Sequence, residues 1–164
     1  MSDSSAKFID PRSVGLRGLE LRKPLFDDAA LQRADDTLQT MGASMVQWLD
    51  DDIARLQQAR TAAEAQSWSM PALETLHGAA HDLKGMGATY GFPIVTQIAA
   101  SLCRLIETDA GKAVARRDPA LVRAHVDALR AAVRDRIQDT RHPVGKALVQ
   151  ALERHVERLG VAPR

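Results

Sequence analysis

A histidine, a lysine and a glycine lie close together in the run His81-Asp82-Leu83-Lys84-Gly85, where apolar residues recur at helical spacing. On a helix, a lysine three residues after a histidine shares its surface, and a glycine four residues on removes a side chain that would crowd the imidazole. A neutral imidazole nitrogen is a nucleophile near neutral pH and can carry a covalent intermediate. An ammonium group can compensate the charge on phosphoryl oxygens. The grouping therefore suits a histidine that carries a phosphoryl group and passes it to another protein.

The same periodicity predicts that the histidine faces solvent. At about 100° per residue, His81 lies roughly 120° from the centre of the apolar stripe, which consists of Leu76, Ala80, Leu83 and Gly87. A glycine within a helix costs about 1 kcal/mol relative to alanine, so Gly85 requires a reason, and access for a docking protein provides one. Gly87 lies on the inner side, where a close approach between helices explains it.

The wider string HDLKGMGATYG, residues 81–91, closely resembles the signature of histidine-containing phosphotransfer (HPt) domains. His81 matches the phosphorylated histidine of that family, and Lys84 matches the lysine that faces the phosphate. Leu83 corresponds to the apolar anchor, Gly85 to the small residue beside the histidine, and Gly91 to the glycine that closes the helix. The resemblance covers roughly residues 41–139.

Two positions depart from the family pattern. Met86 stands where a small residue, often serine, is usual. Many family members also carry a glutamine on the following helix that holds the imidazole, and counting without gaps places Cys103 at that position. A cysteine cannot hold the imidazole as well as a glutamine.

The resemblance implies a phosphoryl carrier, not a kinase. His81 would accept a phosphoryl group and exchange it with an aspartate of a response-regulator receiver domain, with Lys84 and Gly85 completing the site. The implied partners are receiver domains and a hybrid histidine kinase. No cofactor is expected on this chain, because Mg²⁺ would be bound by the receiver domain, and no Gly-rich nucleotide loop is present.

Three alternatives remain at this point. The chain could be a helical scaffold that docks receiver domains without carrying phosphate. His77 and His81 are four residues apart and could bind a metal ion from one helix face, which would make the chain a metal-binding helical regulator. The third alternative is a dimerising fragment of a histidine kinase. The histidine of such kinases is usually followed by an acidic residue and a proline, and here Asp82 is followed by Leu83.

The apolar spacing predicts an all-α fold: an antiparallel up-down four-helix bundle with additional N- and C-terminal helical elements. Residues 1–26 contain Pro11, Gly15, Gly18 and Pro24 and are expected to form an irregular arm, followed by a helical domain over residues 27–160. A first helix is expected from about Asp27 to a break at Gly42. The later helices are expected at about 45–56, from about 70 to a stop at Gly91, and at 93–111, 119–133 and 143–160.

Composition supports a soluble globular protein. The 164 residues carry a net charge of +1, which gives no reason to expect nucleic acid as a partner. No apolar run approaches the roughly 20 residues that span a bilayer, and residues 1–10 lack the apolar stretch of a secretory signal. The single cysteine, Cys103, fits a reducing cytoplasm. The acidic run Asp50-Asp51-Asp52 is expected to be solvated, and His125 is expected at the surface or at a helix cap.

Overall fold

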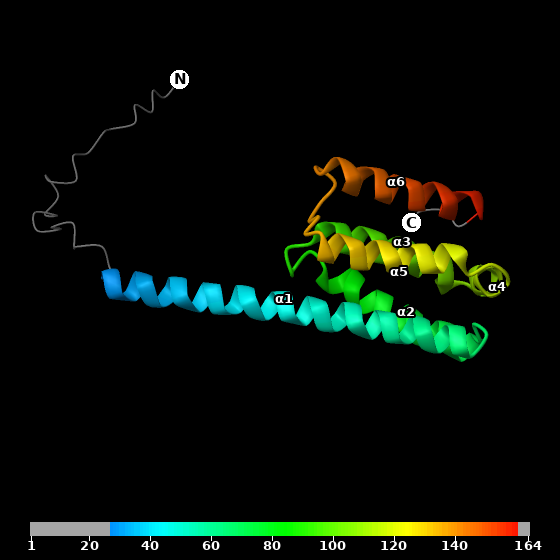
Figure 1. The fold of residues 1–164 in the computed structure, drawn as a ribbon, viewed down its shortest axis with the longest axis horizontal. Coiled ribbons are helices and arrows are strands. Elements are labelled where there is room, and N and C mark those ends of the chain that lie inside the picture. The colour runs from blue at the N-terminus through cyan, green and yellow to red at the C-terminus, as the bar shows by residue number, and fades with distance from the viewer. Residues whose placement is uncertain (1–26, 161–164) are drawn as a thin grey trace, which may run out of the picture. The chain divides into compact units, whose positions relative to one another are not determined.

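The structure, a computed structural model, describes residues 27–160, and every regular element among them is a helix. The predicted all-α fold is confirmed, and the predicted arm over residues 1–26 lies outside the described residues. The described chain divides into two units at Gly42, and the packed helices belong to the unit that begins there. No helix in the described range combines the length and apolar character needed to cross a membrane. The helices, shown in Figure 1, are α1 (Asp28–Ala65), α2 (Met70–Met86), α3 (Pro93–Glu107), α4 (Asp109–Arg117), α5 (Ala120–Arg134) and α6 (Pro143–Arg158).

The predicted break at Gly42 is wrong, because α1 runs through it without interruption from Asp28 to Ala65. Gly42 keeps a right-handed helical conformation, unlike Gly91 and Gly160, which both have positive φ. A single glycine costs a helix only about 1 kcal/mol, and the residues on either side of it tolerate helix well. A break requires a second signal, such as a positive φ or a following proline, and neither occurs here.

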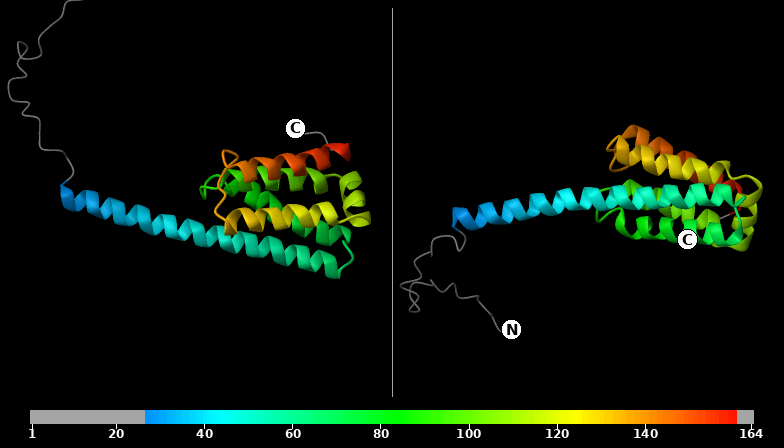
Figure 2. Two further views of the ribbon diagram at one scale, coloured as in Figure 1. Left: turned by 45° about the horizontal axis from the view of Figure 1, so that its top comes forward. Right: turned by 60° about the horizontal axis from the view of Figure 1, so that its bottom comes forward.

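Helices α2 and α3 form an antiparallel pair joined by a tight turn (Figure 2). The turn contains Gly91, whose φ of +83° lies in the region that favours glycine. At Gly87 a Cβ atom would lie 2.7 Å from the backbone nitrogen of Thr96, so the close helix approach predicted for this glycine is confirmed. The buried core of the bundle includes Leu76 and Leu83 of α2, both fully inaccessible to solvent.

Helix α4 is absent from the sequence-based prediction, which extended the preceding helix to Gly111. Helix α3 instead ends at Glu107, and Thr108 caps a new helix by accepting a hydrogen bond from the Gly111 backbone nitrogen at 3.1 Å. A Cβ at Gly111 would lie 2.1 Å from the Leu105 carbonyl oxygen, so only glycine lets α4 turn back over the end of α3. The change of direction places Lys112 of α4 beside Glu74 of α2.

Helix α6 is the additional C-terminal helix that the sequence predicts, and it packs on α3 and α5. Leu152 and Val156 bury its apolar side. Glu153 pairs with Arg104 of α3, and both side chains are at least three-quarters buried. The sixth helix is therefore an integral part of the packed unit.

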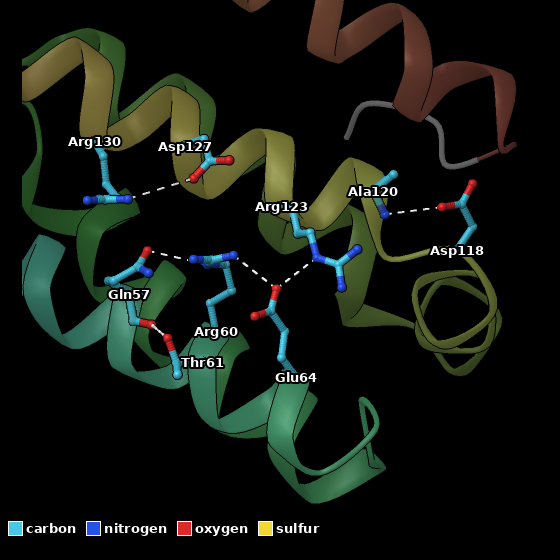
Figure 3. Close-up of polar contacts among 9 residues, drawn as sticks. All are labelled: Gln57, Arg60, Thr61, Glu64, Asp118, Ala120, Arg123, Asp127 and Arg130. Carbon is cyan, nitrogen blue, oxygen red and sulfur yellow. Dashed lines mark hydrogen bonds and ion pairs between the residues drawn. The ribbon is translucent and has the colours of Figure 1, made fainter.

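An ion network joins the second half of α1 to α5 (Figure 3). Glu64 accepts hydrogen bonds from Arg60 of its own helix at 2.9 Å and from Arg123 of α5 at 2.7 Å. The hydrogen bond from Arg123 is the main reason that the pKa of Glu64 is lowered. Arg123 also lies over the ring of Trp68, 5.5 Å from its centroid. These contacts hold the second half of α1 against α5.

Candidate functional site

His81 lies on α2 with its side chain exposed, as the helix periodicity predicts. Its neighbours on the inner side of the helix, Ala80 and Leu83, are fully buried. The buried residues fix the rotation of α2 about its axis, because turning the helix would expose them. The imidazole is thus held toward solvent by the packing of the opposite face.

Two glycines flank the histidine on one side of α2. Gly78 precedes His81 by three residues and Gly85 follows it by four, so both share its helix surface. A Cβ built at either glycine would have nothing within 4 Å. No packing requirement within the described residues therefore explains them, in contrast to Gly87. The HPt-like string begins at His81 and so includes Gly85 but not Gly78, although a second glycine within the same helix is a signal in the sequence.

The other side of His81 carries basic and imidazole groups. His77 lies one turn before it with the two ring centroids 6.3 Å apart, and Lys84 follows one turn after it. His77 is half-buried, and burial is the main cause of its lowered pKa. Glu107 acts in the opposite direction, raising the pKa of His77, whereas Lys112 lowers it further. His77 is therefore favoured in its neutral form.

Lys112 reaches this side from α4. Its ammonium group lies 3.4 Å from a carboxylate oxygen of Glu74, one of the first residues of α2, and its side chain is only 12% exposed. Lys112 could not be predicted from the sequence, because no spacing along the chain places it near residue 77. Only the turn at Thr108 brings α4 to this position.

A groove of about 410 Å³ runs between α1 and α2, on the glycine side of α2. Ala59 and Ala62 of α1 and Ala79 of α2 supply apolar lining, and Asp82 lies at its edge. Asp52 also lines it but is 6% exposed, so the predicted solvation of the whole acidic run is wrong at this residue. Asp52 is buried because it accepts hydrogen bonds from Arg55 and from the Tyr90 hydroxyl, the latter at 3.2 Å.

No group of three or more His, Cys, Asp or Glu side chains in residues 27–160 is arranged to hold a metal ion. His77 and His81 share a helix face, as the metal-binding alternative requires, but no third ligand converges on them among these residues.

Comparison with protein families matches residues 31–132 to the Hpt domain. The chain belongs to the Hpt domain family. Domains of this family are phosphocarrier modules of two-component signalling, not kinases, and they interact with receiver domains and kinases. Comparison with curated proteins found no match, and comparison with solved structures found none either.

Within the Hpt match, α2 and α3 are covered completely and α6 lies beyond it. Cys103, which counting without gaps places at the glutamine position of many HPt domains, is buried on α3. Burial raises the pKa of its thiol to about 11, while Lys84 exerts the largest opposing effect. The thiol is therefore neutral and offers only a weak hydrogen-bond donor in place of an amide. Any strong donor to a group on His81 must come from elsewhere.

Proposed function

We propose that His81 accepts a phosphoryl group from an aspartyl phosphate of a receiver domain and returns it in the reverse reaction. A neutral ring nitrogen of His81 forms the new N–P bond as the P–O bond to the aspartate breaks and the carboxylate leaves. Lys84 offers its ammonium group to the equatorial oxygens. The receiver domain supplies the Mg²⁺ ion that completes charge compensation.

The observation that carries this proposal is the open space around an outward imidazole. His81 is exposed, and a Cβ at Gly78 or Gly85 would meet no atom within 4 Å. A transfer between proteins requires the receiver aspartate to reach the imidazole nitrogen in line with the breaking bond. The two glycines leave that approach free of side chains, at the known energetic disadvantage of glycine within a helix.

The partner is proposed to approach from the glycine side and to cover the groove between α1 and α2. The apolar surface of Ala59, Ala62 and Ala79 favours burial against a partner's apolar side chains. The opposite side of His81, with His77 and Lys84, then stays available to the phosphoryl oxygens. Docking and charge compensation would thus use different sides of one helix.

The test is incubation of this chain with a phosphorylated receiver domain that carries labelled phosphate. Label is expected on the chain, stable in alkali and labile in acid, and absent from His81→Ala. The matched control is His155→Ala, which removes an exposed histidine of α6 and should leave the label unchanged. Persistence of the label in His81→Ala would contradict the proposal.

The scaffold alternative gives a different result in the same assay. A scaffold should bind the receiver domain without becoming labelled, and His81→Gln should preserve its binding and its signalling output. A carrier should lose its signalling output in His81→Gln even when binding to the receiver, measured by calorimetry, persists.

A further inference from the structure

We propose that His77 is a second binding residue for the phosphoryl group carried by His81, donating a ring N–H to a phosphoryl oxygen. This inference rests on the proposed function of His81 and adds a residue outside the string of residues 81–91 that carries the family resemblance. The juxtaposition that supports it is a second imidazole one helical turn away, on the same side as Lys84.

The distance between the two rings suits a bridged contact. Their centroids are 6.3 Å apart and the ring planes are tilted by 35°. A direct hydrogen bond needs about 2.7–3.2 Å between heavy atoms. The larger separation leaves room for a phosphoryl oxygen on His81 to lie between the rings, within reach of a nitrogen of His77.

The position of His77 is also fixed better than that of a typical surface residue. It is half-buried, whereas His81 and Lys84 are exposed. A partly buried side chain has already lost rotational freedom, so it sacrifices less entropy when it binds the phosphoryl group. The lysine, on a flexible stem, supplies charge but little direction.

A donor on α2 matters because the nearby thiol on α3 is a poor one. Cys103 of α3 is buried, close enough to Lys84 for that ammonium group to act on its pKa, and offers only a weakly donating thiol. His77 approaches from the preceding turn of α2 instead of from α3.

The charged groups that act on His77 indicate how the contact would respond to phosphorylation. Glu107 of α3 favours its protonated form, whereas Lys112 of α4, Lys84 and His81 disfavour it. Glu74 accompanies Lys112 as its ion-pair partner. A phosphoryl group at His81 adds a charge of about −1.5 to −2 close to His77 and these groups. Phosphorylation should therefore raise the pKa of His77, by about one pH unit for a partly exposed site.

The first experiment measures the pKa of His77 by NMR of the imidazole nitrogens, before and after loading with phosphoramidate. This small phosphodonor modifies histidine without a partner protein. The expected result is a rise of about one pH unit at His77 and no change at His142, an exposed histidine at the start of α6. An unchanged pKa at His77, or modification of His77 itself in His81→Ala, would overturn the inference.

The second experiment measures how phosphoryl groups partition between the chain and a receiver domain at equilibrium. His77→Leu should shift the partition about five-fold toward the receiver, the factor expected for one ordinary hydrogen bond. His77→Gln keeps an N–H donor and should recover most of the loss. Equal partition in wild type and His77→Leu would refute a direct contact.

The two experiments separate this inference from the function on which it rests. If phosphoramidate loads His81 and the pKa of His77 rises, but no receiver domain transfers its phosphoryl group, the contact stands and the proposed function fails. If transfer occurs and neither the pKa nor the partition responds to His77, the function stands and this inference fails.

Discussion

Acidification should destabilise this protein through His125, a histidine with no part in the proposed chemistry. His125 is fully buried on α5. Its Nδ1 lies 2.7 Å from the Leu121 carbonyl oxygen, which can only accept, so Nδ1 carries the proton. Its Nε2 lies 3.0 Å from the Ser101 hydroxyl, which therefore donates to the neutral ring. Burial lowers the pKa of His125 from 6.5 to about 4.

The sign and the size of the effect follow from the difference between the folded and unfolded states. Between pH 6.5 and pH 4 the unfolded chain binds a proton at His125 that the folded chain does not. The contribution to stability is therefore complete above the unfolded pKa and is lost as the pH falls toward the folded one. The lowered pKa corresponds to roughly 3 kcal/mol in full, of which about 2 kcal/mol should be lost between pH 8 and pH 5.

The assay is urea denaturation at a series of pH values for wild type and His125→Gln. Glutamine keeps hydrogen-bonding groups but cannot titrate, so the carboxylates common to both proteins cancel in the comparison. Wild type should lose about 2 kcal/mol more than the variant between pH 8 and pH 5. Parallel stability curves would refute the reasoning. An NMR titration of wild type that gave His125 a pKa above 6 would refute it independently, even if the variant failed to fold.

Three further predictions concern packing and access. Gly85→Ala should raise the free energy of unfolding by up to about 1 kcal/mol, since a Cβ meets nothing there, yet slow transfer from a phosphorylated receiver. Unchanged transfer kinetics would show that the glycine does not serve access. Gly87→Ala should lower the free energy of unfolding by about 1–3 kcal/mol, because its Cβ would lie 2.7 Å from the Thr96 nitrogen, and urea titration measures this. An unchanged free energy of unfolding in Gly87→Ala would mean that the turn between α2 and α3 shifts to accept the Cβ atom at no cost. Glu153→Ala leaves Arg104 largely buried without its carboxylate and should cost about 2 kcal/mol in the same assay, whereas an exposed pair would cost less than 1 kcal/mol.

Much of the fold could be predicted because helix formation depends mainly on residues that are close together in the sequence. Apolar spacing predicted the helices that became α2, α3, α5 and α6, and prolines or glycines marked most of their ends. The errors arose where a local signal was ambiguous. Gly42 predicts a break that does not occur, because one glycine disrupts a helix only weakly. The turn at Thr108 has no clear sequence signal, because the residues of α3 and α4 both have a helical pattern.

Burial of polar residues could not be predicted in this way. His125 was expected at the surface, but Ser101 and the Leu121 carbonyl group satisfy both its ring nitrogens in the interior. Asp52 was expected to be solvated with its neighbours, but Tyr90, far along the chain, supplies a hydrogen-bond partner. A polar side chain can be buried when distant groups satisfy it, and the identity of those groups depends on packing.

The sequence by itself determined that His81 lies on a helix, faces away from an apolar stripe and is followed by a lysine and a glycine. These are relations within two turns of one helix, fixed by its period. Only the tertiary structure decided which side of that helix is open and which is polar. Lys112 and Glu107 come beside His77 because α3 and α4 pack there, while the glycine side borders the groove with α1. Such contacts join residues distant in the chain, and no local periodicity encodes them.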